Sequence, residues 1–175
     1  MAAKKKAAKK PARKSAPRKA KPIPDNYRVV TPYLAVRGAA MAIDYYKKVF
    51  GMKERMRMAA PGGKIGHAEL TVGDSVVMLA DESAEMDFHG PQSRGGTSVT
   101  MNLFVRDCDA VFAKAVAEGG KAKRPVQDQF YGDRSGIVED PFGHLWNIAT
   151  HKEDLTTKEM MRRLDEMMKK GGGNG

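Results

Sequence analysis

His67 and Glu69 are the two residues of this sequence whose types and spacing point most directly to chemistry. They stand at positions i and i+2 of the strand-like stretch "GHAELTV", so both side chains leave the same face of a strand. A histidine beside a carboxylate can act as a base that the carboxylate orients, or the two can be metal ligands. The pair can also be a purely structural hydrogen bond at the surface of a sheet. The spacing by itself leaves these three alternatives open.

Other side chains could contact a ligand without doing chemistry themselves. Arg134 follows a turn that contains Tyr131 and could clamp a carboxylate or phosphate. An ion pair between Arg134 and Asp133 is the simpler alternative. The remaining candidates for the wall of a binding cavity are Tyr33, Asn102, Phe104 and Asn147. Ordinary packing within a sheet is an equal alternative for the aromatic members of this group.

The elements that must position these residues form an internal repeat. "VTPYLAVRGAAMAIDYYKKVFG", residues 30–51, aligns with "VTMNLFVRDCDAVFAKAVAEGG", residues 99–120, at a constant offset of 69 residues. The same offset pairs Gly63 with Gly132, Ala68 with Ile137, and Met78 with Asn147. Two halves of about 60 residues therefore share one structural plan.

Each half predicts a strand, a helix and three further strands. Alternation of apolar residues predicts the opening strands at 30–36 and 99–105. Three further strands complete each half, at 53–60, 64–72 and 75–81 and at 122–129, 134–139 and 144–150. Helical spacing predicts one helix near 38–50 and another from the N-cap Asp107 to Gly119-Gly120. One face of each sheet is apolar and needs its helix, while the other is mixed polar and aromatic and suits a cavity. Trp146 shares its face with Ile148 and is predicted to be core, and Asp140-Pro141 has the composition of a turn.

Two segments set in these paired βαβββ modules are distinctive, namely "GHAELTVGDSVVMLAD" and "YGDRSGIVEDPFGHLWNIAT". Together they resemble the glyoxalase, bleomycin-resistance and ring-cleaving dioxygenase superfamily (the vicinal oxygen chelate, or VOC, superfamily), and within it the PhnB-like branch. The resemblance covers residues 27–152, with modules at 27–81 and 98–152. It implies an α+β fold in which two tandem βαβββ modules form a curved mixed sheet around a cavity. It also implies a homodimer.

The resemblance further implies where a metal would be held. Metal-using members of the superfamily take ligands from four strands that line the cavity. The matching positions in this chain are Thr31, Met78, Thr100 and Asn147. Divalent cations prefer histidine, carboxylate or thiolate ligands, and none of these positions supplies one. We therefore expect no metal cofactor at the family's usual site.

The positive charge of the chain is concentrated at one end. The formal net charge is +10, and residues 1–24 contain eight Lys, two Arg and no acidic residue, so residues 25–175 are formally neutral. We predict that residues 1–26 are a disordered tail, because they offer almost no apolar surface to bury. Such a tail can bind nucleic acid without reading its sequence, or serve only as a solubilising arm. At the other end, an amphipathic helix is predicted over 153–170 and a disordered end over 171–175.

The cysteine content and the lengths of the apolar runs bear on the cellular compartment of the protein. Its single cysteine, Cys108, excludes an intrachain disulfide and fits a reducing cytoplasm. No apolar run reaches the length of about 18 residues that a membrane span requires, so no membrane partner is expected.

Three hypotheses follow from these observations. The leading one is a cytoplasmic homodimer that sequesters a small molecule in the cavity without the usual metal. The first alternative is a lyase, isomerase or dioxygenase of the same superfamily that uses His67 and Glu69 in an acid–base or metal site. Whether the chain is an enzyme therefore stays open. The second alternative is a nucleic-acid-associated protein that binds through residues 1–24.

Overall fold

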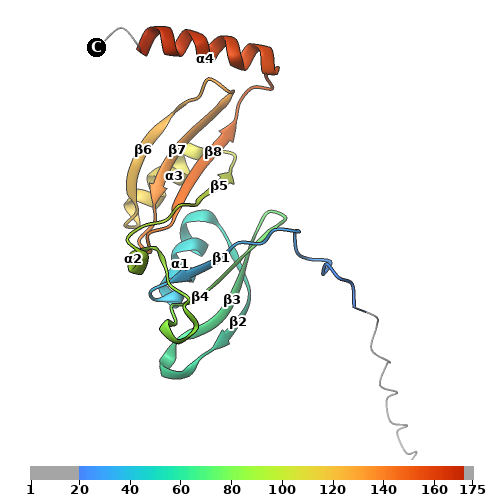
Figure 1. The fold of residues 1–175 in the computed structure, drawn as a ribbon, viewed down its shortest axis with the longest axis vertical. Coiled ribbons are helices and arrows are strands. Elements are labelled where there is room, and N and C mark those ends of the chain that lie inside the picture. The colour runs from blue at the N-terminus through green and yellow to red at the C-terminus, as the bar shows by residue number, and fades with distance from the viewer. Residues whose placement is uncertain (1–19, 172–175) are drawn as a thin grey trace, which may run out of the picture.

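A computed structural model describes residues 20–171, which form two modules stacked along the long axis of the molecule (Figure 1). The first module contains β1 (Tyr33–Val36), α1 (Ala39–Phe50), β2 (Lys53–Ala59), β3 (Ile65–Val72) and β4 (Ser75–Asp81). The second contains β5 (Thr100–Phe104), α3 (Cys108–Ala117), β6 (Lys121–Asp128), β7 (Asp133–Glu139) and β8 (Leu145–His151). The predicted βαβββ plan is confirmed in both halves.

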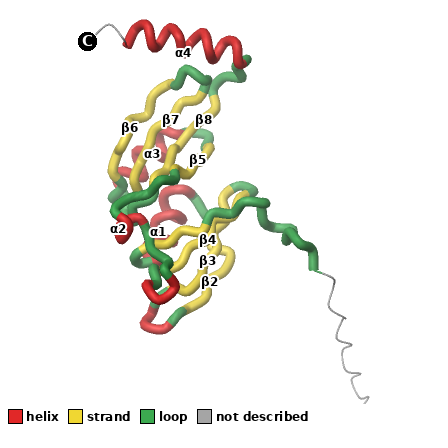
Figure 2. The backbone as a smooth tube through the Cα atoms, in the orientation of Figure 1, coloured by secondary structure: helices red, strands yellow, loops and turns green. Residues whose placement is uncertain are grey.

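Each module has its own four-stranded sheet, and Figure 2 shows the strands as two separate groups. The strand orders are β1-β4-β3-β2 and β5-β8-β7-β6. Both sheets are mixed, because β1 runs parallel to β4 and β5 runs parallel to β8 while the other pairs are antiparallel. Helix α1 packs on the first sheet and α3 on the second. We call the face of each sheet opposite its helix the open face.

The strand register confirms the sequence repeat and corrects one detail of it. Tyr33 lies opposite Met78 in the first module, and Asn102 lies opposite Asn147 in the second, at the predicted offset. In the neighbouring strand, however, Ala68 corresponds to Gly136 and not to Ile137. Ala68 and Gly136 are the residues that face the equivalent positions Leu79 and Ile148. The one-residue shift arises because the two hairpin turns differ in length. The turn between β3 and β4 has two residues (73–74), whereas the turn between β7 and β8 has three unpaired residues (141–143) between Asp140 and His144.

The two modules are joined by a buried polar hub at Asp140, which is only 2% exposed. One carboxylate oxygen accepts the Tyr46 hydroxyl from α1 (2.7 Å) and the Trp146 Nε1 hydrogen from β8 (2.9 Å). The other accepts the backbone amides of Phe142 and His144, both at 2.9 Å. Trp146 belongs to the core, as predicted. Asp140 therefore both shapes the turn before β8 and holds a helix of the first module against the second.

The segment between the modules is fastened to the first module by Glu82. Its short elements are the 3₁₀ turn Ala84–Met86 and the helix α2 (Pro91–Arg94); a further 3₁₀ turn, Pro61–Gly63, precedes β3. The Glu82 carboxylate accepts hydrogen bonds from the Ser93 hydroxyl (2.6 Å), the Gly90 amide (2.7 Å) and Arg37 Nε (2.9 Å). Together these three hydrogen bonds lower the pKa of Glu82 to about 2. The Ser93 hydroxyl has the largest effect on this pKa, followed by Arg37 and Gly90.

This lowered pKa predicts a stability loss in acid that depends on Glu82. A carboxyl whose pKa is lower in the folded chain contributes stability above its ordinary pKa, and the contribution is lost as the pH falls toward the folded value. We expect the free energy of unfolding of the wild type to drop between pH 6 and pH 3 by more than that of Glu82→Gln, measured by urea unfolding at both pH values. Glu85→Gln, an exposed residue of the same segment, is the control and should behave as the wild type. Equal losses in wild type and Glu82→Gln would contradict the prediction.

Helix α4 (Thr157–Gly171) lies beyond the second module, at the top of Figure 1. It begins four residues later than the predicted segment 153–170, because the Thr156 hydroxyl caps it by accepting the Glu159 amide (3.2 Å). Its amphipathic character is as predicted, with Met161, Met167 and Met168 at least half exposed. In the described part of the chain no helix is both long and apolar enough to cross a membrane. Most of the predicted tail, and residues 172–175, lie outside the described residues.

Candidate functional site

A hydrogen-bonded cluster on the open face of the first sheet is built around Glu69. This carboxylate is only 3% exposed, and its Oε1 lies 3.3 Å from His67 Nε2. The other ring nitrogen of His67, Nδ1, lies 2.9 Å from the Tyr33 hydroxyl. The structure thus joins three of the residues that sequence analysis singled out. They come from β1 and β3, which are not adjacent in the sheet because β4 lies between them.

Arg55 completes the charge balance of this cluster through an irregularity in β2. The register between β2 and β3 shifts between Glu54 and Met56, so Arg55 is the extra residue of a β-bulge. Its Nη1 lies 3.4 Å from Glu69 Oε2. Sequence reasoning missed Arg55, because strict alternation groups it with Arg57, whose side chain instead pairs with Glu54 (2.8 Å). A bulge leaves no mark in the alternation of residue types.

Tyr27 reaches the same carboxylate from ahead of the first strand. Its hydroxyl donates to Glu69 Oε1 (2.5 Å), and its ring centroid lies 4.7 Å from the Arg55 guanidinium carbon, a cation–π contact. No sequence pattern pointed to Tyr27, because it lies in a segment without strand or helix periodicity. We call Tyr27, Tyr33, Arg55, His67 and Glu69 the Glu69 cluster.

The electrostatics of the Glu69 cluster favour an ionised carboxylate. Burial by itself raises the pKa of Glu69, but hydrogen bonds from Tyr27 and His67 and the charge of Arg55 outweigh burial and leave the pKa below its ordinary value. With the carboxylate ionised, His67 Nε2 donates a hydrogen bond to it, and Nδ1 accepts a hydrogen bond from the Tyr33 hydroxyl. Burial raises the pKa of Tyr33, so its hydroxyl stays protonated at neutral pH. Glu69 Oε2 is buried without a hydrogen-bond partner among the described residues.

The open face of the second sheet carries a different group of side chains. Asn147 Nδ2 donates to Asn102 Oδ1 (2.8 Å) across the parallel pair β5 and β8. The Oδ1 atom of Asn147 is buried, with no hydrogen-bond partner among residues 20–171. Phe104, two residues beyond Asn102 on the same strand, is 63% exposed. This face therefore offers an amide pair beside an uncovered aromatic ring, and it lies on a different sheet from the Glu69 cluster.

A comparison with protein-family models places this arrangement in a known family. The model described as "Glyoxalase/Bleomycin resistance protein/Dioxygenase superfamily" matches residues 28–148. The chain belongs to this superfamily. The resemblance seen in the two distinctive segments is therefore confirmed.

Relatives and solved structures of this VOC protein agree with that assignment. An uncharacterized Mycobacterium bovis protein, Mb0911c, is 40% identical over 134 residues, which cover 75% of this chain and 88% of that one. The crystal structure of TioX from Micromonospora sp. ML1 is 31% identical, with a TM-score of 0.56 over 69% of this chain and 96% of TioX. A PhnB protein from Bacillus cereus shares the fold at 18% identity, with a TM-score of 0.57 over 70% of this chain and 99% of that one.

The divalent cation that many VOC proteins hold does not fit the side chains present here. The four positions implied by the family are Thr31, Met78, Thr100 and Asn147. Their donors are hydroxyls, a thioether and an amide, none of which is a strong ligand for a divalent cation. Among residues 20–171, no three His, Cys, Asp or Glu side chains come together as a metal site. His67 and Glu69 lack a third ligand of this kind.

Arg134 and Tyr131 lie outside the Glu69 cluster. Arg134 is held by Asp109 of α3 through two hydrogen bonds (2.7 and 2.8 Å) and by Asp128 of β6 (3.2 Å). The alternative ion pair with Asp133 is wrong. Arg134 packs toward α3, on the face opposite the open one, so its donors are already used within the second module. Tyr131 lies in the turn before β7, and its ring stands edge-on to Phe130.

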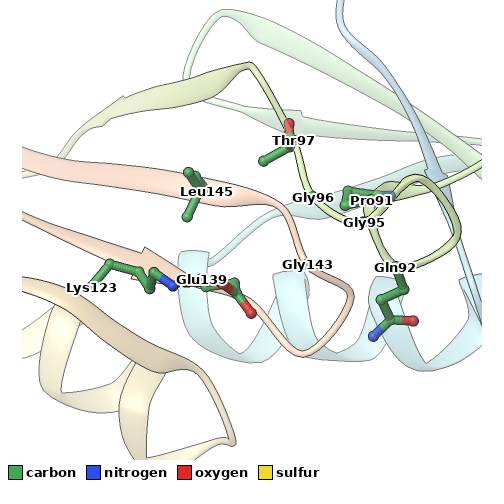
Figure 3. Close-up of a pocket in the computed structure, with 9 residues that line it drawn as sticks. All are labelled: Pro91, Gln92, Gly95, Gly96, Thr97, Lys123, Glu139, Gly143 and Leu145. Carbon is green, nitrogen blue, oxygen red and sulfur yellow. Dashed lines mark ion pairs between the residues drawn. The ribbon is translucent and has the colours of Figure 1, made fainter.

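Three cavities of the VOC domain lie where its modules meet. One of about 390 Å³ lies between the β3–β4 turn and β5, and its walls include Arg28, Val30, Asn102, Phe104 and Trp146. Another of about 230 Å³ lies where Tyr33 meets Phe88 and His144. The cavity in Figure 3, about 380 Å³, has walls of loop backbone from Gly95 and Gly96 and an ion pair between Lys123 and Glu139 (3.2 Å). The 230 Å³ cavity has one member of the Glu69 cluster, Tyr33, in its wall, and the rest of that wall is largely the intermodule segment.

Proposed function

We propose that this VOC protein binds a small molecule on the open face of its first sheet, in contact with Tyr33 and the rest of the Glu69 cluster. The observation that carries the proposal is a nearly buried carboxylate that faces the open side of a sheet, and whose Oε2 has an ion-pair partner in Arg55 (3.4 Å) but accepts no hydrogen bond. A buried oxygen that accepts no hydrogen bond costs free energy, so a ligand that donates a hydrogen bond there is favoured. Proteins of this superfamily bind small molecules and often dimerise, which supports the proposal.

Binding fits this geometry better than acid–base catalysis by His67. Both ring nitrogens have partners inside the cluster, Nδ1 with Tyr33 and Nε2 with Glu69. A general base needs a lone pair within hydrogen-bond reach of the proton that it removes. A lyase, isomerase or dioxygenase acting through His67 and Glu69 would require Tyr33 to leave Nδ1 first. The side chains at the four family metal positions also support binding without a divalent metal.

The expected result of a ligand screen follows from this proposal. A ligand at 100 times its dissociation constant raises the free energy of unfolding by about 2.7 kcal/mol, which thermal-shift measurement detects. Glu69→Gln should lose most of this stabilisation, because it weakens the acceptor at the centre of the cluster. Glu85→Gln, at an exposed position, should keep it. An equal thermal shift in Glu69→Gln would place the ligand elsewhere. Stoichiometric zinc, nickel, manganese or iron in the purified protein would contradict the metal-free part of the proposal.

The open faces support a homodimer as the working form. Four apolar side chains on or beside them are 46–63% exposed, namely Tyr33, Met58, Val99 and Phe104. Exposed apolar groups of this size on the face of a sheet are typical of surfaces that another protein covers. We propose that a second copy of the chain covers them and encloses the bound ligand.

Two further expectations concern nucleic-acid binding and the cellular location of the protein. The alternative of nucleic-acid binding depends on residues 1–24, most of which lie outside the described residues, and neither the family nor the relatives support it. The cytoplasmic location is an expectation that rests on the use of a single cysteine in the sequence.

A further inference from the structure

The chain that leads into β1 is attached to the first module mainly through one side chain. We call residues 20–31 the N-terminal strap. It contains no helix or strand, and every one of its residues from 20 to 30 is exposed except Tyr27. Val29 and Val30 are 85% and 83% exposed, so the strap buries almost no apolar surface of its own. Figure 1 shows it in blue, passing the turn between β3 and β4.

The contacts of the strap are few and mostly exposed to solvent. Arg28 forms an ion pair with Asp74 of the β3–β4 turn, and both side chains are more than half exposed. Exposed pairs of this kind contribute little to stability. Arg55 Nη1 also donates to the Asn26 carbonyl at 3.5 Å, the outer limit for a hydrogen bond. The Tyr27 side chain is therefore the principal anchor of the strap.

The site that Tyr27 occupies is built from the sheet. Glu69 and His67 lie on β3 and Arg55 on the bulge of β2, and these strands pair with each other. Arg55 covers the ring and Glu69 accepts the hydroxyl, which are the two interactions that recognise any phenol. A cavity of about 400 Å³ adjoins the strap here, with walls that include Asp25, Tyr27, Arg55, Thr71 and Val76. That volume exceeds the size of a single phenol ring.

We infer that Tyr27 is a displaceable internal ligand and that the site beneath the strap takes a free phenol, or another hydroxyl-bearing aromatic, when the strap leaves. The inference rests on the proposed function and names the chemical class of its ligand. The strap and the ligand compete for Glu69 and Arg55, so the apparent affinity for the ligand is reduced by the fraction of molecules in which the strap is seated. Ligand binding would in turn release the strap.

The test uses the full chain and 4-methylphenol, which has the chemical structure of the tyrosine side chain. Isothermal titration calorimetry should show that Tyr27→Ala binds 4-methylphenol at least about tenfold more tightly than the wild type, because the internal competitor is gone. Toluene, which lacks the hydroxyl, should bind Tyr27→Ala at least about fivefold more weakly than 4-methylphenol does. Adding Glu69→Gln to Tyr27→Ala should remove the gain. Tyr27→Phe, which keeps the ring against Arg55 but loses the hydroxyl, should give an intermediate affinity.

The possible results separate this inference from the proposed function. Equal affinities of wild type and Tyr27→Ala for 4-methylphenol would overturn the inference, provided that circular dichroism shows the variant to be folded. If a screened ligand still stabilised the wild type in a Glu69-dependent way, the proposed function would stand without it. Tight binding of toluene and 4-methylphenol alike would also overturn it, because Glu69 would then play no part in recognition. Should Tyr27→Ala not fold, an unchanged affinity in Tyr27→Phe would overturn the inference instead.

Discussion

Replacing Asp140 with alanine is expected to lower the free energy of unfolding by about 3–5 kcal/mol. The carboxylate is 2% exposed and accepts four hydrogen bonds, two of them from the buried side chains of Tyr46 and Trp146. Alanine leaves these donors without an acceptor, and each unsatisfied buried group costs about 1–3 kcal/mol. Water can enter the space that alanine leaves and accept hydrogen bonds from some of these donors, so the total loss is smaller than the sum of the four separate costs. The contact between α1 and the second module should loosen as a result.

Urea unfolding measures this effect directly. Trp146 is the single tryptophan of the chain and lies at the hub, so its fluorescence reports the environment that the substitution changes. Asp154→Ala is the matched control, because its carboxylate is fully exposed and pairs only with the half-exposed His151; it should change stability by no more than about 1 kcal/mol. Asp140→Asn, which keeps one acceptor oxygen, should fall between the two. An Asp140→Ala protein as stable as Asp154→Ala would show that the hub does not hold the modules together.

The second large effect concerns the proposed dimer. Phe104→Glu is expected to raise the dissociation constant of the dimer at least about 100-fold, because it places a carboxylate without a partner in an interface that would exclude water. Phe104 is 63% exposed within one chain, so the same change should leave the folding of the monomer almost unaffected. The expected product is a folded monomer.

Sedimentation or light scattering over a range of protein concentrations checks this expectation. Met41→Glu provides the control, because Met41 is 65% exposed on α1, on the helix-covered side of the first sheet. That variant should remain dimeric. A monomeric wild type at micromolar concentration would contradict the dimer itself. A dimer that Phe104→Glu leaves intact would place the interface away from the open face of the second sheet.

Much of this architecture can be read from the residues alone. The offset between the two halves predicted that Met78 and Asn147 occupy equivalent positions, and the strand registers agree. Alternation has a period of two residues, so the helix-facing and open faces of each strand without a bulge follow from local pattern. For this reason Trp146 could be placed in the core, and His67 and Glu69 on one face, before any tertiary contact was known. These features depend on neighbours in sequence, which a single chain displays.

What the sequence could not determine depends on contacts between distant segments and on single-residue irregularities. Arg55 joins the Glu69 cluster because a bulge shifts one strand by a residue, a change that alternation does not record. Tyr27 joins it from 42 positions away, through its hydroxyl on Glu69 and its ring against Arg55. Asp140 has the composition of a turn residue, yet its burial follows from the docking of α1, which brings Tyr46 from 94 positions away. The local pattern determines the face of the sheet on which a side chain lies. Only the tertiary structure determines which residues that side chain contacts, because those residues come from distant segments and are positioned by packing.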